Sequence, residues 1–171
     1  MGGTPSGGAD DPERPYRKAR AYAFKLLAVR DRSARELLTR LSEKHPEAIA
    51  ERIVAEFTED DYLNDARLAT RLAEVLTQSR HYGPRRVRHE LARRGIGADD
   101  AAAALSPLSD GDRVRDTALA ASLTHLKGSV EPADERTQRR LAGYLGRRGF
   151  PDSIIRDMVY LARDGRLTEE P

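Results

Sequence analysis

The chain has 171 residues, a net charge of +2, 34% charged residues and only 5% aromatic residues, with no tryptophan. This composition argues against one thick hydrophobic core and favours thin helical layers with much solvated surface. Because the chain has no cysteine, disulfides and thiolate metal sites are excluded. No apolar run approaches the roughly 20 residues that span a bilayer, so we expect a cytoplasmic protein without membrane contacts.

The pattern of apolar residues and turn residues predicts an all-α fold made of three tandem three-helix modules of about 50 residues each. Strand signals are almost absent, since no segment keeps a period-two alternation between turn residues. The predicted segments are a disordered leader at 1–15, modules at 16–62, 63–108 and 109–163, and a polar tail at 164–171 that is expected to fray. Three such modules in a row predict an elongated, curved arrangement.

The first two modules contain recognisable helix starts. A first helix is expected to begin near Tyr16, and Ser33 followed by Glu36 has the spacing of a capping box that opens the second helix. A third helix should follow Pro46. The second module opens at Asn64, a favourable N-cap residue.

The later helices are separated by clear breaks. A Ser-, Pro- and Gly-containing stretch at 106–111 divides the second module from the third, which is expected to begin near Asp112. Its second helix should span about 135–148. The last helix of the second module, at 98–105, has an uncertain register because alanines replace the large apolar residues.

One apolar stripe recurs in all three modules. In the segment 83–96, Pro84 suits a helix start, Gly95 suits a left-handed terminator, and Val87 and Leu91 share one face. Leucine pairs stand 50 positions earlier, at 37 and 41, and 54 positions later, at 141 and 145. An Arg-Arg-Gly sequence followed by an apolar residue, at 93–96 and again at 147–150, supports a true repeat.

Charge is distributed unevenly along the chain. An acidic stretch from Glu43 to Asp65 is followed by six arginines against one glutamate between Arg80 and Arg94. This pattern predicts a polyanionic or acidic partner, because guanidinium groups donate paired hydrogen bonds to phosphates and carboxylates. The candidate binding residues lie in the second and third modules: Arg80, Tyr82, Arg85, Arg86, Arg88, Arg93, Arg139, Arg140 and Arg147.

Each candidate has a structural alternative. The arginines could form an ordinary solvated face, and Tyr82 could pack beneath its loop instead of stacking on a base. The acidic run at 59–65 is explained more economically by a turn and a helix cap than by a metal site. With no histidine pair at ligand spacing and no nucleophile placed beside a base, the sequence predicts no catalytic residue, metal or cofactor.

Four short motifs resemble those of the RecX family. They are Arg-Ser-Ala-Arg-Glu-Leu at 32–37, Tyr-Leu-Asn-Asp-Ala-Arg-Leu-Ala at 62–69, Gly-Pro-Arg-Arg-Val at 83–87 with Glu-Leu at 90–91 and Arg-Gly-Ile at 94–96, and Leu-Gly-Arg-Arg-Gly-Phe at 145–150. The resemblance extends from about Lys18 to Val159. The sequence departs from the family pattern at Asp61, where glycine is usual, at Asn64, where aspartate is usual, and at 45–46, where a Lys-Gly turn is usual.

The resemblance implies a non-enzymatic regulator of the RecA recombinase, and we expect the protein to be a monomer. Such proteins lie in the groove of the RecA filament on single-stranded DNA and depress strand exchange, ATP hydrolysis and coprotease function. The expected partners are therefore the RecA filament and DNA, single-stranded and also double-stranded. An autonomous DNA-binding protein is the alternative hypothesis, and a metal-dependent nuclease is a third.

Overall fold

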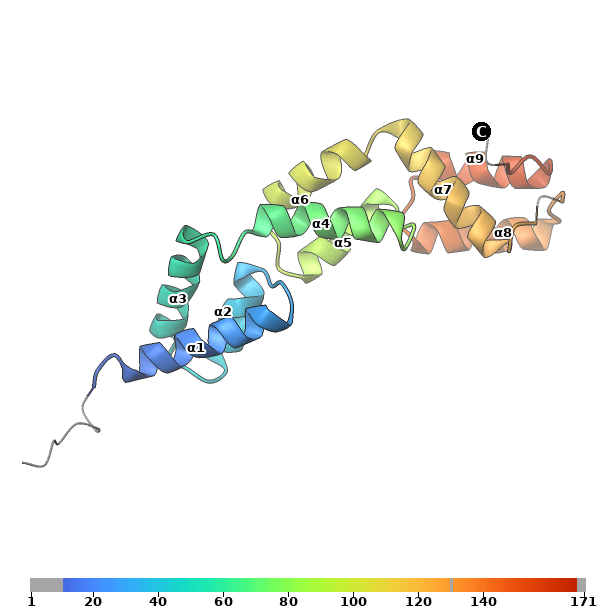
Figure 1. The fold of residues 1–171 in the computed structure, drawn as a ribbon. Coiled ribbons are helices and arrows are strands. Elements are labelled where there is room, and N and C mark those ends of the chain that lie inside the picture. Colours follow the sequence, from blue (N-terminus) through green and yellow to red (C-terminus); the bar gives the residue numbers. More distant parts are fainter. Residues whose placement is uncertain (1–10, 130, 169–171) are drawn as a thin grey trace, which may run out of the picture. The chain divides into compact units, whose positions relative to one another are not determined.

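The computed structural model describes residues 11–129 and 131–168, and these residues form nine α-helices and one short 3-10 helix with no strand. The helices group in threes (Figure 1), so the all-α, tandem three-helix prediction is confirmed. Their bounds are α1 Arg14–Val29, α2 Ala34–Ser42, α3 Glu47–Glu59, α4 Asp65–Gln78, α5 Pro84–Arg93, α6 Ala98–Leu105, η1 Ser106–Leu108, α7 Gly111–His125, α8 Glu135–Arg147 and α9 Asp152–Arg163. Most of the predicted leader, at 1–10, and the end of the tail, at 169–171, lie outside the described residues.

Helices α1 to α3 belong to a compact unit that ends at Asn64. Its core buries the predicted pair Leu37 and Leu41 together with Ile53 and Phe57, all fully inaccessible to solvent. The capping box at the start of α2 is present, because the Ser33 hydroxyl accepts from the backbone N–H three residues later at 3.1 Å and the glutamate there reaches back. The periodicity of this module therefore predicts its core correctly.

The first helix begins at Arg14, two residues before the predicted start near Tyr16. Pro15 lies in its first turn, where a missing N–H costs no hydrogen bond. At the other end of the unit, Asp61 adopts φ 59° directly after α3. This left-handed conformation favours glycine, so aspartate stands here in a glycine-like backbone position.

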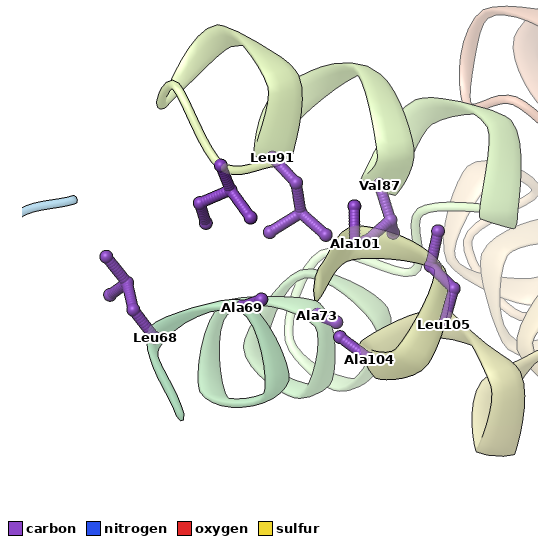
Figure 2. Close-up of a cluster of buried hydrophobic side chains, with 9 residues drawn as sticks. Leu68, Ala69, Ala73, Val87, Leu91, Ala101, Ala104 and Leu105 are labelled. Carbon is purple, nitrogen blue, oxygen red and sulfur yellow. The ribbon is translucent and has the colours of Figure 1, made fainter. Parts of the chain in front are cut away.

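The second compact unit begins at Asp65 and contains the other two bundles. In the first of them, Val87 and Leu91 of α5 point at alanines of α4 and α6 (Figure 2). Ala69 and Ala73 of α4 are buried in the same cluster as Ala104 of α6. Small residues on both helices let the two backbones approach closely, which is why α6 needs no large apolar residues except Leu105 at its end.

The third bundle packs α7, α8 and α9 around Leu141, Leu145, Phe150 and Met158, all at most 1% exposed. Between α7 and α8 the chain returns to the bundle at Ala133, whose N–H donates to a carbonyl near the end of α9 at 2.9 Å. Leu141 and Leu145 of α8, the third copy of the apolar pair, are buried in their bundle as the first two copies are in theirs.

The prediction of a frayed polar tail is wrong at residues 164–168. Gly165, with φ 66°, ends α9 in a left-handed conformation, and the Arg166 N–H donates to the carbonyl of Leu161 at 2.8 Å. This closing pattern turns the chain back so that Leu167, only 1% exposed, enters the core. A single apolar residue after a glycine was too weak a sequence signal to outweigh the polar composition around it.

The Arg-Arg-Gly motif has a structural explanation. At the end of α5, Gly95 has φ 77° and the Ile96 N–H donates to the carbonyl of Leu91, and Gly149 and Phe150 repeat this arrangement at the end of α8. Glycine is needed for the left-handed turn, and the next residue is carried into the core. The motif is thus a helix terminator with a hydrophobic anchor.

Candidate interaction surface on helices α5 and α8

Helix α5 separates an apolar face from a cationic one. Val87 and Leu91 are fully buried, whereas Arg85, Arg88 and Arg93 are exposed. The separation follows from the period of 3.6 residues per turn.

An acidic side chain between these arginines neutralises part of the cationic face. The Glu90 carboxylate binds Arg86 at 2.6 Å and Arg93 at 3.2 Å, and only 14% of its side chain is exposed. Arg85 forms a long ion pair of 3.5 Å with Asp152, and both side chains are largely exposed. Among the arginines of α5, Arg88 forms no ion pair with the described residues.

Helix α8 repeats the arrangement with a different distribution of partners. Arg139 pairs with Glu135 at 2.8 Å, an exposed contact that water and salt weaken. Arg140 and Arg147 are exposed and form no ion pair with any other residue that the structure describes. At the start of the helix, Arg136, Arg139 and Arg140 line an open hollow of about 470 Å³. The α8 face therefore keeps more uncompensated charge than the α5 face.

The two helices meet end to end. The backbone N–H of Gly83, the N-cap of α5, donates to the carbonyl of Arg148 at 2.7 Å, and the Arg85 N–H donates to the carbonyl of Gly149 at 3.2 Å. The first N–H groups of a helix and its last carbonyls lack partners within the helix. Here the end of α8 satisfies the start of α5, which fixes one arginine-bearing helix against the other.

Two glycines make this close approach possible. A Cβ atom on Gly83 would lie 2.6 Å from the carbonyl oxygen of Gly149, and one on Gly149 would lie 2.3 Å from the backbone nitrogen of Arg86. Both separations are far below ordinary contact. We call this contact the α8–α5 joint, defined by residues 83–86 and 148–149.

Aromatic and guanidinium groups stack beside the joint. The guanidinium of Arg148 lies 4.6 Å from the ring centre of Tyr144 and 5.4 Å from that of Tyr82, and the guanidinium of Arg86 lies 5.6 Å from the Tyr82 ring. Arg148 also donates to the backbone carbonyl of Arg80. Tyr82 is half-buried against the core of its bundle, so the structure favours packing over free stacking for this residue.

The structure brings four of the nine predicted residues together at the joint, whereas the other five lie elsewhere on α5 and α8. Arg85, Arg86 and Tyr82 lie at the joint itself, and the Arg80 carbonyl reaches it. The sequence analysis omitted Arg148 and Tyr144. Arg148 stands in the Arg-Arg-Gly motif at 147–150, and Tyr144 takes the place of Glu90 in the 54-residue repeat, but neither signal indicates that the two side chains stack.

The acidic run before α4 forms a turn. Asp61 has a left-handed backbone, and the Asn64 side-chain amide donates to its carboxylate at 2.8 Å. Within residues 11–129 and 131–168, no three His, Asp or Glu side chains gather as metal ligands would. No helix in the described part of the chain is long and apolar enough to cross a membrane.

Fold and surface together define a class: an all-helical protein of tandem three-helix domains with a pair of joined, arginine-rich helices. Family models for the first and second three-helix domains of RecX match residues 19–57 and 64–105. A regulatory protein RecX from Amycolatopsis mediterranei is 35% identical over 155 residues, covering 86% of this chain and 85% of the relative. The chain belongs to the RecX family, whose members are named regulatory proteins.

Two further relatives support membership of this family, and a solved structure supports the fold. The regulatory protein RecX of Trichlorobacter lovleyi is 32% identical over 80% of this chain and 90% of its own length, and that of Streptomyces coelicolor is 30% identical over 94% and 86%. The crystal structure of RecX from Lactobacillus salivarius matches with a TM-score of 0.75 at 19% identity, covering 86% of this chain and 96% of that chain. At this identity the likeness supports the fold alone.

Proposed function

We propose that this protein is a non-enzymatic inhibitor of the RecA recombinase that binds in the groove of the RecA filament on single-stranded DNA through helices α5 and α8. The observation that carries the proposal is the α8–α5 joint, which holds two arginine rows in one fixed unit. Membership of a family of regulatory proteins supports a binding role. The protein would thereby suppress strand exchange, ATP hydrolysis and coprotease activity.

The arginines differ in how readily they can engage an anionic surface. Arg88, Arg140 and Arg147 can bind at once, since they form no ion pair with described residues. Arg86 and Arg93 must first leave Glu90. Exposed ion pairs contribute about 0–1 kcal/mol. The Glu90 side chain is only 14% exposed, so releasing Arg86 and Arg93 from it costs more than breaking an exposed pair.

Regulation requires the protein to distinguish filament states. A ligand shifts an equilibrium only by its difference in affinity for the two states. We therefore expect tighter binding to the inactive arrangement of filament subunits than to the active one.

The test is the ATPase activity of RecA on single-stranded DNA, measured while the protein is titrated at constant salt. The proposal predicts progressive inhibition that saturates, with strand exchange inhibited over the same concentration range. ATP hydrolysis that stays constant up to a molar excess of the protein over RecA would refute it.

Autonomous DNA binding is the second candidate, favoured by the three arginines around the hollow on α8. In that case the affinity for bare single strands should fall with salt at a logarithmic slope of about −0.7 per phosphate contact. Inhibition of RecA without measurable binding to bare DNA would reject this candidate and retain the first.

A further inference from the structure

One position distinguishes the arginine row of α5 from that of α8. The 54-residue repeat places Glu90 in α5 where α8 has Tyr144. The arginines four residues before and three residues after this position are the same in both helices: Arg86 and Arg93 in α5, Arg140 and Arg147 in α8. A comparison of the two helices therefore shows what a carboxylate at this position does to its two arginines.

Glu90 holds both arginines of α5 at once. Its Oε1 atom lies 2.6 Å from Nη2 of Arg86 and its Oε2 atom lies 3.2 Å from Nε of Arg93, so each carboxylate oxygen has its own guanidinium. Only 14% of the Glu90 side chain is exposed, so these contacts are screened less than those of an exposed pair. At the equivalent positions of α8, Arg140 and Arg147 are exposed and form no ion pair with a described residue.

A fixed carboxylate inside an arginine row acts differently on two classes of partner. A single strand of nucleic acid presents only phosphates, which must displace Glu90 from the guanidinium groups and then remain beside a charge of their own sign. A protein surface presents both signs, so a lysine or arginine of the partner can compensate Glu90 while its acidic groups meet the exposed arginines. Discrimination between partners depends on such a repulsive group as much as on attractive contacts.

We propose that Glu90 is a specificity-determining residue, which withholds Arg86 and Arg93 from the phosphates of bare nucleic acid and so favours a protein surface of mixed charge as the partner of α5. The cations that this helix still presents are Arg85 and Arg88, both exposed. The inference rests on the proposed role of α5 in binding the filament, and it adds the residue that selects the partner.

The experiment measures the affinity of the protein for a thymidine oligonucleotide by fluorescence anisotropy over a range of salt concentrations. Glu90→Gln keeps the length of the side chain and removes its charge, so that Arg86 and Arg93 become available for one or two phosphate contacts. Each contact on a single strand changes the slope of log affinity against log salt by about −0.7, so the slope should become steeper by about 0.7 to 1.4. At about 0.1 M salt the same contacts should raise the affinity about 5- to 25-fold.

Two further variants separate this effect from the loss of one negative charge. Glu74→Gln removes the same charge from an exposed position on α4 that forms no ion pair with a described residue, so its affinity should stay within about twofold of wild type. Adding Arg86→Gln and Arg93→Gln to Glu90→Gln should abolish the gain. A slope that Glu90→Gln leaves unchanged, or an equal gain with and without the two arginines, would overturn the inference.

A measurement on the wild-type protein keeps the test valid if Glu90→Gln folds poorly. When the oligonucleotide is added, the guanidinium NMR signals of Arg140 and Arg147 should shift, whereas those of Arg86 and Arg93 should not. Equal shifts of both pairs would overturn the inference, as would absence of oligonucleotide binding by both wild type and Glu90→Gln. The RecA ATPase titration decides the proposed regulatory function separately, because it does not depend on binding to bare DNA.

Discussion

The α8–α5 joint can be tested with a single methyl group. Gly83 has φ −75° and ψ 165°, a conformation that alanine adopts without strain, so Gly83→Ala perturbs the contact with α8 and, to a smaller extent, the helix cap. The new Cβ would lie 2.6 Å from the Gly149 carbonyl oxygen, and an ordinary contact of 3.4 Å requires the two helices to separate by about 0.8 Å.

This separation weakens both backbone hydrogen bonds of the joint. Their lengths of 2.7 and 3.2 Å would increase to about 3.5 and 4.0 Å, at or beyond the limit of a hydrogen bond. Each is worth about 0.5–1.5 kcal/mol, so Gly83→Ala should destabilise the unit that begins at Asp65 by about 1–3 kcal/mol. Urea unfolding followed by circular dichroism measures this loss, and amide exchange should show that the Arg85 N–H loses protection.

A matched control is available in the same bundle. Gly97 is the N-cap of α6, with nearly the same backbone conformation (φ −63°, ψ 157°), and a Cβ there meets nothing closer than 3.9 Å. Gly97→Ala therefore shares the capping change but not the collision. Equal stability of the two variants, within about 0.5 kcal/mol, would refute the view that the joint holds α5 against α8.

Two further changes test other parts of the fold. Leu167→Ala should destabilise the third bundle by about 2–5 kcal/mol in urea unfolding, because it empties a buried core position. Thr168→Ala, an exposed position beside it, should cost less than about 0.5 kcal/mol. Equal effects of the two substitutions would show that the tail is not packed. Hydrogen bonds from Tyr16 and then Arg20 hold the pKa of the Glu56 carboxyl below its usual value of about 4.3. Its contribution to the stability of the α1–α3 unit should be complete above that value and be lost as the pH falls through the lowered pKa. Glu56→Gln should flatten this acid dependence in thermal unfolding, and an unchanged pH profile would contradict it.

Much of the fold follows from local sequence signals. The leucine and valine pairs of α2, α5 and α8 are buried as their spacing predicts, and Gly95 ends its helix in the expected left-handed turn. Such signals work because each involves residues close in sequence: a period of 3.6, a cap, a terminator. The burial of Leu167 was not predicted, because it depends on a turn that brings this residue back across the bundle.

The organisation of the surface was harder to predict. Composition identified the arginine rows, but it could not show that Glu90 holds Arg86 and Arg93, or that Arg148 is placed between Tyr82 and Tyr144. The joint itself depends on two glycines 66 residues apart, at 83 and 149, whose backbones meet only after both bundles have formed. Long-range backbone contacts leave no periodic trace in the sequence.

The most direct test of the account is the affinity of the protein for the RecA filament on single-stranded DNA after arginine substitution. The double variant Arg140→Gln with Arg147→Gln removes two exposed charges from α8, and Arg71→Gln with Arg156→Gln removes the same charge from α4 and α9. We predict that the first variant binds the filament at least tenfold more weakly while the second stays within about twofold of wild type, since a charge-assisted contact is worth about 1.5–3 kcal/mol. Equal binding by the two variants would contradict the claim that α8 is part of the filament-binding surface.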